Sequence, residues 1–121
     1  MFIELIDKIR SRLPSKINSK LRPLWFFIQR LERGFDDSEL WSLDATLCKF
    51  LLPRLKRFKK VTCVHPACLS QEEWNSILDE IIWLCEQYEN NRFYARLDDN
   101  EEVRANKAKD LLGEYLFCLW W

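Results

Sequence analysis

The stretch SQEEWNSILDEIIWLCEQY, residues 70–88, decides the fold class of this chain. Ser70, with Glu73 three residues later, makes a capping box, and Leu69 and Trp74 fit the hydrophobic staple that flanks such a start. Apolar side chains then recur at a spacing close to 3.6 residues, which places them on one face of a helix. They are Trp74, Ile77, Leu78, Ile81, Ile82, Cys85 and Tyr88. The stretch therefore predicts a long amphipathic helix.

The rest of the chain also favours helices. Only two glycines and four prolines occur among 121 residues, whereas a β-sandwich or barrel needs turn residues about every 8 to 12 positions. We therefore expect an all-α fold, a compact bundle of about four to five helices, in a single domain over residues 1–121. The helices expected besides the one after Ser70 are residues 2–13, 24–33, one or two between 37 and 60, and roughly 101–119.

Individual residues mark the expected helix ends. Pro14 stops the first helix, Pro23 suits the first position of the second, and Gly34 is a C-terminal cap. Residues 36–39, DDSE, predict the start of the third helix through a capping-box-like arrangement. Pro53 should kink or divide that helix. The predicted apolar stripe of the third helix is Leu40, Leu43, Leu47, Phe50 or Leu51, Leu55 and Phe58.

A net charge of zero hides a division of charge along the sequence. Residues 1–70 hold fourteen Lys and Arg against seven Asp and Glu, and residues 71–121 hold five against twelve. Such asymmetry arises when one surface meets an anion from outside. It arises equally when the two halves pack against each other and attract, so both interpretations stay open.

The densest run of charge is RLKRFKK, residues 54–60. Five cations in seven residues, with two apolar positions between them, are typical of a phosphate-binding helix face. The alternative is structural, because cations near a helix C-terminus also complement its macrodipole. A second basic stretch favours the functional interpretation. Its cations are Lys16, Lys20, Arg22, Arg30 and Arg33.

The most distinctive local string is RGFDDSELWSLD, residues 33–44. Trp41 and Asp44 are three residues apart on one helical face, so an indole stands beside a carboxylate. Together with Arg33 they offer a planar ring, an acid and a guanidinium, which suit a nucleobase or a partner's arginine. The alternative is a buried Trp41 with an Asp44–Arg33 ion pair that locks two helices. The predicted ligand-binding residues are Arg33, Trp41, Asp44, Arg54, Lys56, Arg57 and Lys60.

Cys63, His65 and Cys68 look most like a chemical site. They offer three soft ligands, whereas a tetrahedral zinc site needs four, and Cys48 or Cys85 supplies the fourth only if the fold brings it close. Their spacing matches no standard finger or ribbon, so we expect no metal and no cofactor. The sequence also lacks GxSxG, HExxH and P-loop patterns, which predicts a non-enzyme without catalytic residues.

The beginning of the sequence and its cysteines predict a cytoplasmic protein. Residues 1–7, MFIELID, carry acids where a secretory leader needs a basic segment. Five cysteines are an odd number for a disulfide framework. No stretch approaches the roughly 20 apolar residues that span a bilayer, so we expect no contact with a membrane.

Two tryptophans end the sequence, and they are the predicted interface residues. Exposed apolar patches generally mark contacts. Trp120 and Trp121 either close the core or dock on a neighbouring subunit. We expect the second, and so a possible homo-oligomer.

Three strings together resemble a family of short, uncharacterised all-helical proteins of tailed bacteriophages. They are RGFDDSELWSLD at 33–44, FLLPRLKRFK at 50–59 and LSQEEWNSILDEIIW at 69–83. The resemblance covers roughly residues 25–90. The segment Cys63–Cys68 departs from the family pattern, in which this loop is not cysteine-rich, and this weakens a zinc site further.

The resemblance implies a host-cell cytosol and a role against host defence. Small non-enzymatic phage proteins clamp a host protein or sequester a nucleotide second messenger. Cations for phosphates and flat rings for bases favour a phage-type binding protein that sequesters an anionic nucleotide-type ligand. The first alternative is a protein–protein inhibitor or assembly component acting on a host defence protein through the acidic half and terminal tryptophans. The second, less favoured, is a nucleic-acid-binding protein.

Overall fold

The computed structural model describes residues 2–89 and 97–120, and these residues form five α-helices, two short 3-10 helices and no strand. The all-α fold class is therefore confirmed. None of these helices is both long and apolar enough to cross a membrane. The chain divides into two compact units, Met1–Leu43 and Asp44–Trp121. The single domain over residues 1–121 stays a prediction.

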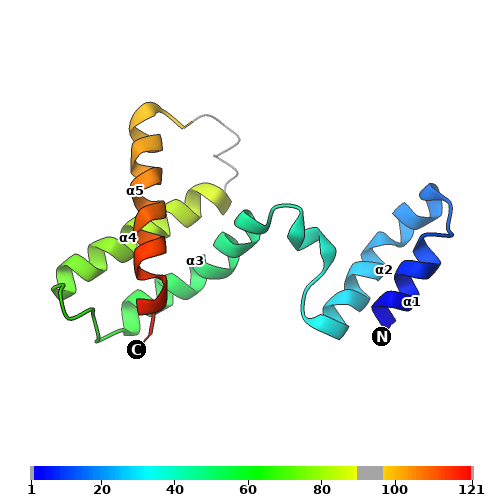
Figure 1. The fold of residues 1–121 in the computed structure, drawn as a ribbon, viewed down its shortest axis with the longest axis horizontal. Helices are drawn as coiled ribbons and strands as arrows, with labels where there is room; N and C mark the ends of the chain where they lie inside the picture. Colours follow the sequence, from blue (N-terminus) through cyan, green and yellow to red (C-terminus); the bar gives the residue numbers. More distant parts are fainter. Residues whose placement is uncertain (1, 90–96, 121) are drawn as a thin grey trace. The chain divides into compact units, whose positions relative to one another are not determined.

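The first unit is a helical hairpin. Its helices α1 (Phe2–Arg10) and α2 (Ser15–Arg33) run side by side in opposite directions (Figure 1). The Glu32 carboxylate accepts hydrogen bonds from the backbone N–H groups of Phe2 at 3.1 Å and Ile3 at 2.8 Å. A negative charge therefore lies at the N-terminus of α1, where it complements the helix dipole.

The start of α2 corrects one expectation. Pro14 caps the N-terminus of α2, and Pro23 lies inside the helix instead of at its first position. The basic residues between them are good helix formers, so their polarity does not end the helix. Asn18 Oδ1 accepts from Arg10 Nε at 3.3 Å and from Trp25 Nε1 at 3.2 Å. These bonds hold α2 on both sides of Pro23 and tie it to α1.

The end of α2 agrees with the sequence, but the next helix does not. Gly34 caps α2 with a left-handed φ of 84°, as expected. Asp36 is a cap too, since it accepts from the Ser38 N–H at 2.8 Å, yet it starts only a 3-10 helix, η1 (Asp37–Leu40). Helix α3 (Leu43–Val61) begins later, and Pro53 does not divide it.

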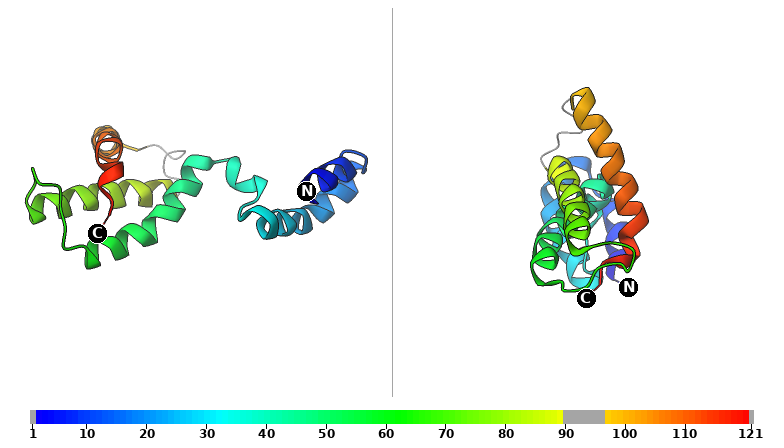
Figure 2. Two further views of the ribbon diagram at one scale, coloured as in Figure 1. Left: turned by 60° about the horizontal axis from the view of Figure 1, so that its bottom comes forward. Right: turned by 90° about the vertical axis from the view of Figure 1, so that its left-hand side faces the viewer.

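The second unit packs α3, α4 (Gln71–Glu89) and α5 (Asp99–Tyr115), followed by the 3-10 helix η2 (Leu116–Cys118). Helix α5 crosses α4 steeply (Figures 1 and 2). The larger of two buried clusters in its described residues comes from α3 and α4 and consists of Cys48, Leu52, Leu55, Trp74, Leu78, Ile81 and Cys85. Leu111, Leu112 and Tyr115 of α5 pack against it. A smaller cluster joins Leu84 of α4 to Ala105 and Ala108 of α5.

Capping boxes begin both later helices of this unit. Ser70 N–H donates to Glu73 Oε2 at 2.7 Å and Glu73 N–H donates to Ser70 Oγ at 3.1 Å, which confirms the predicted box on α4. A second box joins Asp98 and Glu101 at the start of α5. The sequence pattern D-x-x-E at these positions carried that signal, although the helix was expected to start near residue 101.

The buried face of α3 differs from the predicted stripe. Leu43, Leu47 and Phe50 are exposed, and Cys48 and Leu52 face the core instead. Apolar packing decides between the two faces, because Cys48, Leu52 and Leu55 are buried against residues of α4. Lys56 and Lys59 of α3 pair with Glu86 and Asp79 of α4 at exposed positions, where an ion pair contributes little stability. Only Leu55, of the predicted stripe in α3, is fully buried.

This assignment of faces predicts effects of very different size for the same substitution at two positions of α3. Leu52 is 6% exposed and Leu47 is 50% exposed. Leu52→Ala should destabilise the second unit by about 2–5 kcal/mol, because it leaves a cavity. Leu47→Ala should change stability by less than about 0.5 kcal/mol. Urea unfolding followed by the methyl NMR signals of Leu78 and Ile81 measures both, and equal effects would contradict the assignment.

Candidate ligand-binding site

The basic run of residues 54–60 divides between two sides of α3. Lys56 Nζ lies 3.0 Å from Glu86 Oε1, and Lys59 Nζ lies 2.5 Å from Asp79 Oδ1. Both pairs join α3 to α4. These two lysines therefore have a structural role, and Lys60 lies beside them at a hollow that also includes Ile82.

The other side of α3 borders an open groove of about 700 Å³, a volume in the range of small-molecule sites. Two cations and six apolar residues line this α3 groove. Its lining residues are Leu51, Pro53, Arg54, Leu55, Arg57, Phe58, Val61 and Leu119.

Arg54 and Arg57 lie one helical turn apart in this lining, and both are exposed. Arg54 Nη1 donates to the Phe50 carbonyl at 2.8 Å, and the guanidinium carbon lies 3.8 Å from the centre of the Phe50 ring. Stacking of this kind holds the guanidinium plane in one orientation. Within residues 2–89 and 97–120, no carboxylate pairs with either arginine.

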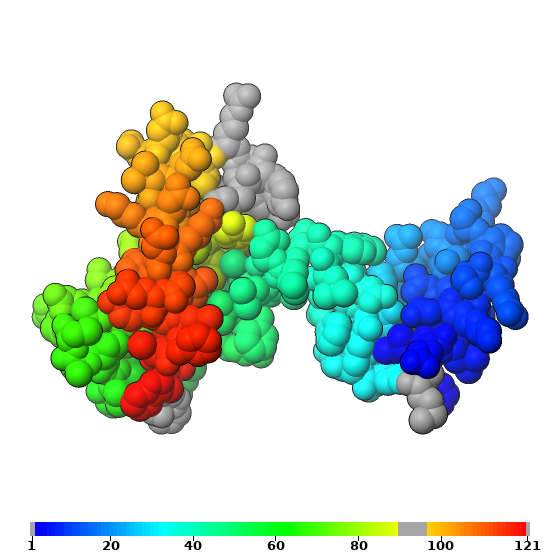
Figure 3. All heavy atoms as spheres, in the orientation of Figure 1, coloured from blue at the N-terminus to red at the C-terminus, as the bar shows by residue number. Residues whose placement is uncertain are grey.

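Leu119, from the far end of the sequence, completes the wall of the α3 groove. It also packs against the core of the second unit. Figure 3 shows the end of the described chain, in red, beside atoms of α3, in green. No pattern in the sequence indicated that Leu119 borders the basic run.

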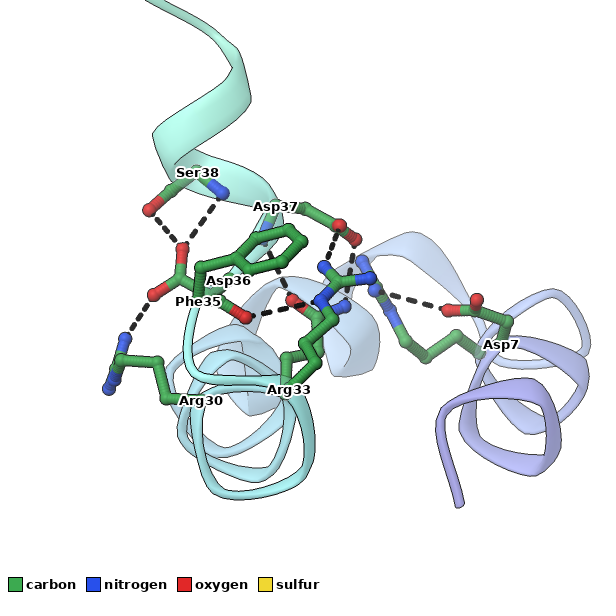
Figure 4. Close-up of polar contacts among 9 residues, drawn as sticks. Asp7, Arg30, Arg33, Phe35, Asp36, Asp37 and Ser38 are labelled. Carbon is green, nitrogen blue, oxygen red and sulfur yellow. Dashed lines mark hydrogen bonds and ion pairs between the residues drawn. The ribbon is translucent and has the colours of Figure 1, made fainter. Parts of the chain in front are cut away.

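The predicted residues Arg33 and Trp41 belong to the first unit. The Arg33 guanidinium pairs with Asp37, and its Nε donates to the Phe35 carbonyl at 3.1 Å (Figure 4). Trp41 is 68% exposed. Its ring meets the edge of Phe26, with 5.8 Å between centroids, and the Arg22 guanidinium lies 5.9 Å from its centre.

The alternative with an Asp44–Arg33 ion pair joins residues of different units, and each has a partner within its own unit. Arg33 pairs with Asp37, four residues away, and Asp44 Oδ1 accepts from the Ala45 N–H at 2.9 Å. The burial of Trp41 expected in that alternative is wrong, since its indole is exposed. Asp44 belongs to the second unit, with Arg54, Lys56, Arg57 and Lys60.

The turn after α2 neutralises its own cations (Figure 4). Arg30 pairs with Asp36 as Arg33 does with Asp37. Gln29, which is fully buried, donates from Nε2 to Asp37 Oδ2 at 2.7 Å and accepts from the Asp37 N–H at 2.9 Å. Two of the five cations in the second basic stretch are therefore already paired.

These contacts lower the pKa of both aspartates. Hydrogen bonds from Arg33 and then Gln29 lower the pKa of Asp37. Burial acts to raise the pKa of Asp36, but the bonds from Ser38 and Arg30 together outweigh it, and the pKa falls. Each bond favours the ionised carboxylate, so both side chains stay charged in the folded hairpin at neutral pH.

The cysteines and the histidine do not gather into a metal site. Among residues 2–89 and 97–120, no three His, Cys, Asp or Glu side chains are placed to hold a metal ion. Cys63 and Cys68 are exposed, and His65 borders a hollow of about 260 Å³ with Cys118 and Trp120. The sequence offered Cys48 and Cys85 as a fourth ligand, but both lie in the core between α3 and α4.

Cys48 and Cys85 contact each other in that core. The contact with Cys48, and then burial, raise the pKa of the Cys85 thiol. Cys85 therefore stays protonated in the core. A metal ligand must be a thiolate, so Cys85 is not suited to bind a metal ion.

The predicted interface residue Trp120 is 64% exposed, and Trp121 lies outside the described residues.

Comparisons of the chain with protein-family models, with curated proteins and with solved structures found no match.

The lowered pKa values predict how the hairpin responds to acid. Since the folded pKa of each aspartate lies below its unfolded value, near 3.9, each stabilises the hairpin above about pH 4, and this contribution is lost as the pH falls through the folded pKa. The double variant Asp36→Asn, Asp37→Asn should therefore be less stable than the wild type at pH 6, and the difference should shrink towards pH 3.

Urea unfolding followed by the NMR signal of the Trp25 indole N–H measures this difference, because that group bonds Asn18 in the folded hairpin. A difference that stays constant from pH 6 to pH 3 would show that the two carboxylates act without their charge.

Proposed function

We propose that the chain is a non-enzymatic binding protein whose α3 groove holds an anionic ligand with an apolar body. One observation carries this proposal. Arg54 and Arg57 border an apolar groove of ligand size, and no carboxylate of the described residues pairs with them. The neighbouring Lys56 and Lys59 are both paired with carboxylates of α4, so the two arginines differ from these lysines.

Each part of the groove has a distinct task. The apolar lining supplies the non-directional part of the affinity, because contact with the ligand removes both surfaces from water. The guanidiniums select for negative charge, since each presents several N–H donors in a planar fork that fits a phosphate or carboxylate. Arg54 has one orientation through its contact with Phe50, so less rotamer freedom is lost when it binds.

A nucleotide is one ligand of this class. Its phosphates would lie on Arg54 and Arg57, and its base would lie against apolar side chains such as Phe58. Six of the eight lining residues are apolar, which gives the groove few groups to read the edge of a base. We therefore propose recognition by charge and apolar contact, with no strong choice among bases.

A phage-type role against host defence belongs to the same proposal. A groove that sequesters a second messenger needs affinity and no catalytic group, which agrees with a sequence free of catalytic motifs. The phage link comes from the resemblance of residues 25–90 alone. The cytosol of a host cell is the compartment that this role requires.

The test is binding of defined anions to the folded protein. Isothermal calorimetry with cyclic AMP, cyclic ADP-ribose and 1-anilinonaphthalene-8-sulfonate covers phosphate and sulfonate anions on different apolar bodies. Binding of at least one should weaken about tenfold for Arg54→Gln and again for Arg57→Gln, because a hydrogen bond to a charged group contributes about 1.5–3 kcal/mol.

The matched control removes two charges elsewhere. Lys49→Gln with Lys107→Gln changes the net charge as much as the arginine double variant does, at exposed positions outside the groove. The control should bind like the wild type. No heat from any of the anions, or equal weakening in both double variants, would remove the proposal.

A second candidate is a protein inhibitor or assembly component that acts through the C-terminal segment. Phe117 is 91% exposed and Trp120 is 64% exposed, and aromatic residues of this kind are enriched at protein interfaces. Recovery of the same host protein by the wild type and by Phe117→Ser, Trp120→Ser would count against it. Nucleic-acid binding has less support, because Lys56 and Lys59 already pair with carboxylates.

A further inference from the structure

Helix α2 has two faces with apolar side chains, and only one of them is covered within the hairpin. Trp25 and Gln29 are buried on the inner face, and α1 contacts this helix. Four other large apolar side chains of α2 are exposed. They are Ile17, Leu24, Phe27 and Leu31.

These four residues and Lys20 form one stripe along α2 by their spacing, which we call the α2 outer stripe. Residues 17, 20, 24, 27 and 31 are spaced alternately by three and four positions. That spacing is the a and d pattern of a coiled coil, in which a second helix packs along the seam. At 1.5 Å per residue the stripe is roughly 20 Å long, or about four helical turns.

The hairpin has little other apolar packing. Ile6 and Trp25 are its only fully buried apolar residues among residues 2–43. A helix pair of this size buries little apolar surface in one thin layer, so its stability is small. A helix along the α2 outer stripe would give it a second layer.

The charges on and beside the stripe indicate which charges a helix docked there would carry. Lys20 lies in the stripe, and Lys16 lies one turn before it. Both are exposed, and no carboxylate of the described residues pairs with them. The cations at the other end of α2 differ, since Arg30 and Arg33 are paired with Asp36 and Asp37.

A second copy of the hairpin does not neutralise these lysines. In a parallel pair, Lys20 would oppose Lys20, and like charges at the seam are unfavourable. In an antiparallel pair centred on Leu24, Lys20 would oppose Phe27. Neither arrangement gives the lysine a carboxylate.

We propose that the α2 outer stripe docks an acidic amphipathic helix of another protein. The partner helix presents apolar residues at a and d spacing and places Asp or Glu against Lys20 and Lys16. Docking of this kind, with apolar anchors spaced along one helix face, is a common mode of protein recognition. The proposal is independent of the α3 groove, which belongs to the other unit.

Two synthetic helices test it against the full chain. Each has about three heptads with leucine at a and d. One carries glutamate at the flanking positions and the other carries lysine there. Fluorescence anisotropy at physiological ionic strength should show binding of the acidic peptide about tenfold tighter than the basic one. Leu24→Glu with Leu31→Glu should abolish binding.

A charge reversal separates recognition from general stickiness. Lys20→Glu should weaken the acidic peptide about tenfold and strengthen the basic one. Lys8→Glu on α1 makes the same change of charge at another exposed position and should leave both affinities as in the wild type. The Trp25 indole NMR signal checks that each variant keeps the hairpin folded.

Three outcomes would overturn the proposal. They are no binding of the acidic peptide to the folded wild type, equal affinity for both peptides, and a wild-type dimer in sedimentation velocity that Leu24→Glu with Leu31→Glu converts to monomer. The last outcome would identify a second copy as the occupant of the stripe.

Discussion

Ion pairs made between neighbours inside each unit decide which cations remain for binding. Arg30 and Arg33 are held by Asp36 and Asp37 at the turn after α2. Lys56 and Lys59 are held by carboxylates of α4. The first two pairs brace the turn, and the other two join α3 to α4 at exposed positions. Within the described residues of α2 and of the run 54–60, the other cations have no carboxylate partner. Those of the run are Arg54, Arg57 and Lys60, and those of α2 lie in its N-terminal half.

Features that depend on a few adjacent residues could be predicted from the sequence. The capping box at Ser70 and the left-handed cap at Gly34 are such features, because both are set by residues within one turn. The capping pattern at residues 36–39 indicates the correct capping residue, Asp36, but it begins the 3-10 helix η1 and not the expected α-helix. A cap specifies that a helical turn begins, and contacts with Gln29 and Arg33 decide that this turn stays short.

The candidate site depends on contacts between residues that are far apart in the sequence, which local sequence patterns do not predict. The sequence identifies Arg54 and Arg57 as cations, but it cannot separate them from Lys56, because the partner Glu86 is 30 positions away. Leu119 borders the groove although it is still farther in the sequence from the other lining residues, which all lie in α3. The buried face of α3 is also set by residues far away in the sequence. Leu47 and Leu52 both belong to apolar stripes, and only packing against α4 determines which of them is buried.

The small core of the hairpin links its folding to its surroundings. With Ile6 and Trp25 as its fully buried apolar residues, the hairpin has less burial to oppose local unfolding than the second unit as described. A molecule that binds only the ordered hairpin raises its stability by mass action, in proportion to the logarithm of that molecule's concentration. Order in residues 2–43 is then a measure of occupancy, and proteolytic sensitivity of this segment would report how much of the protein is engaged.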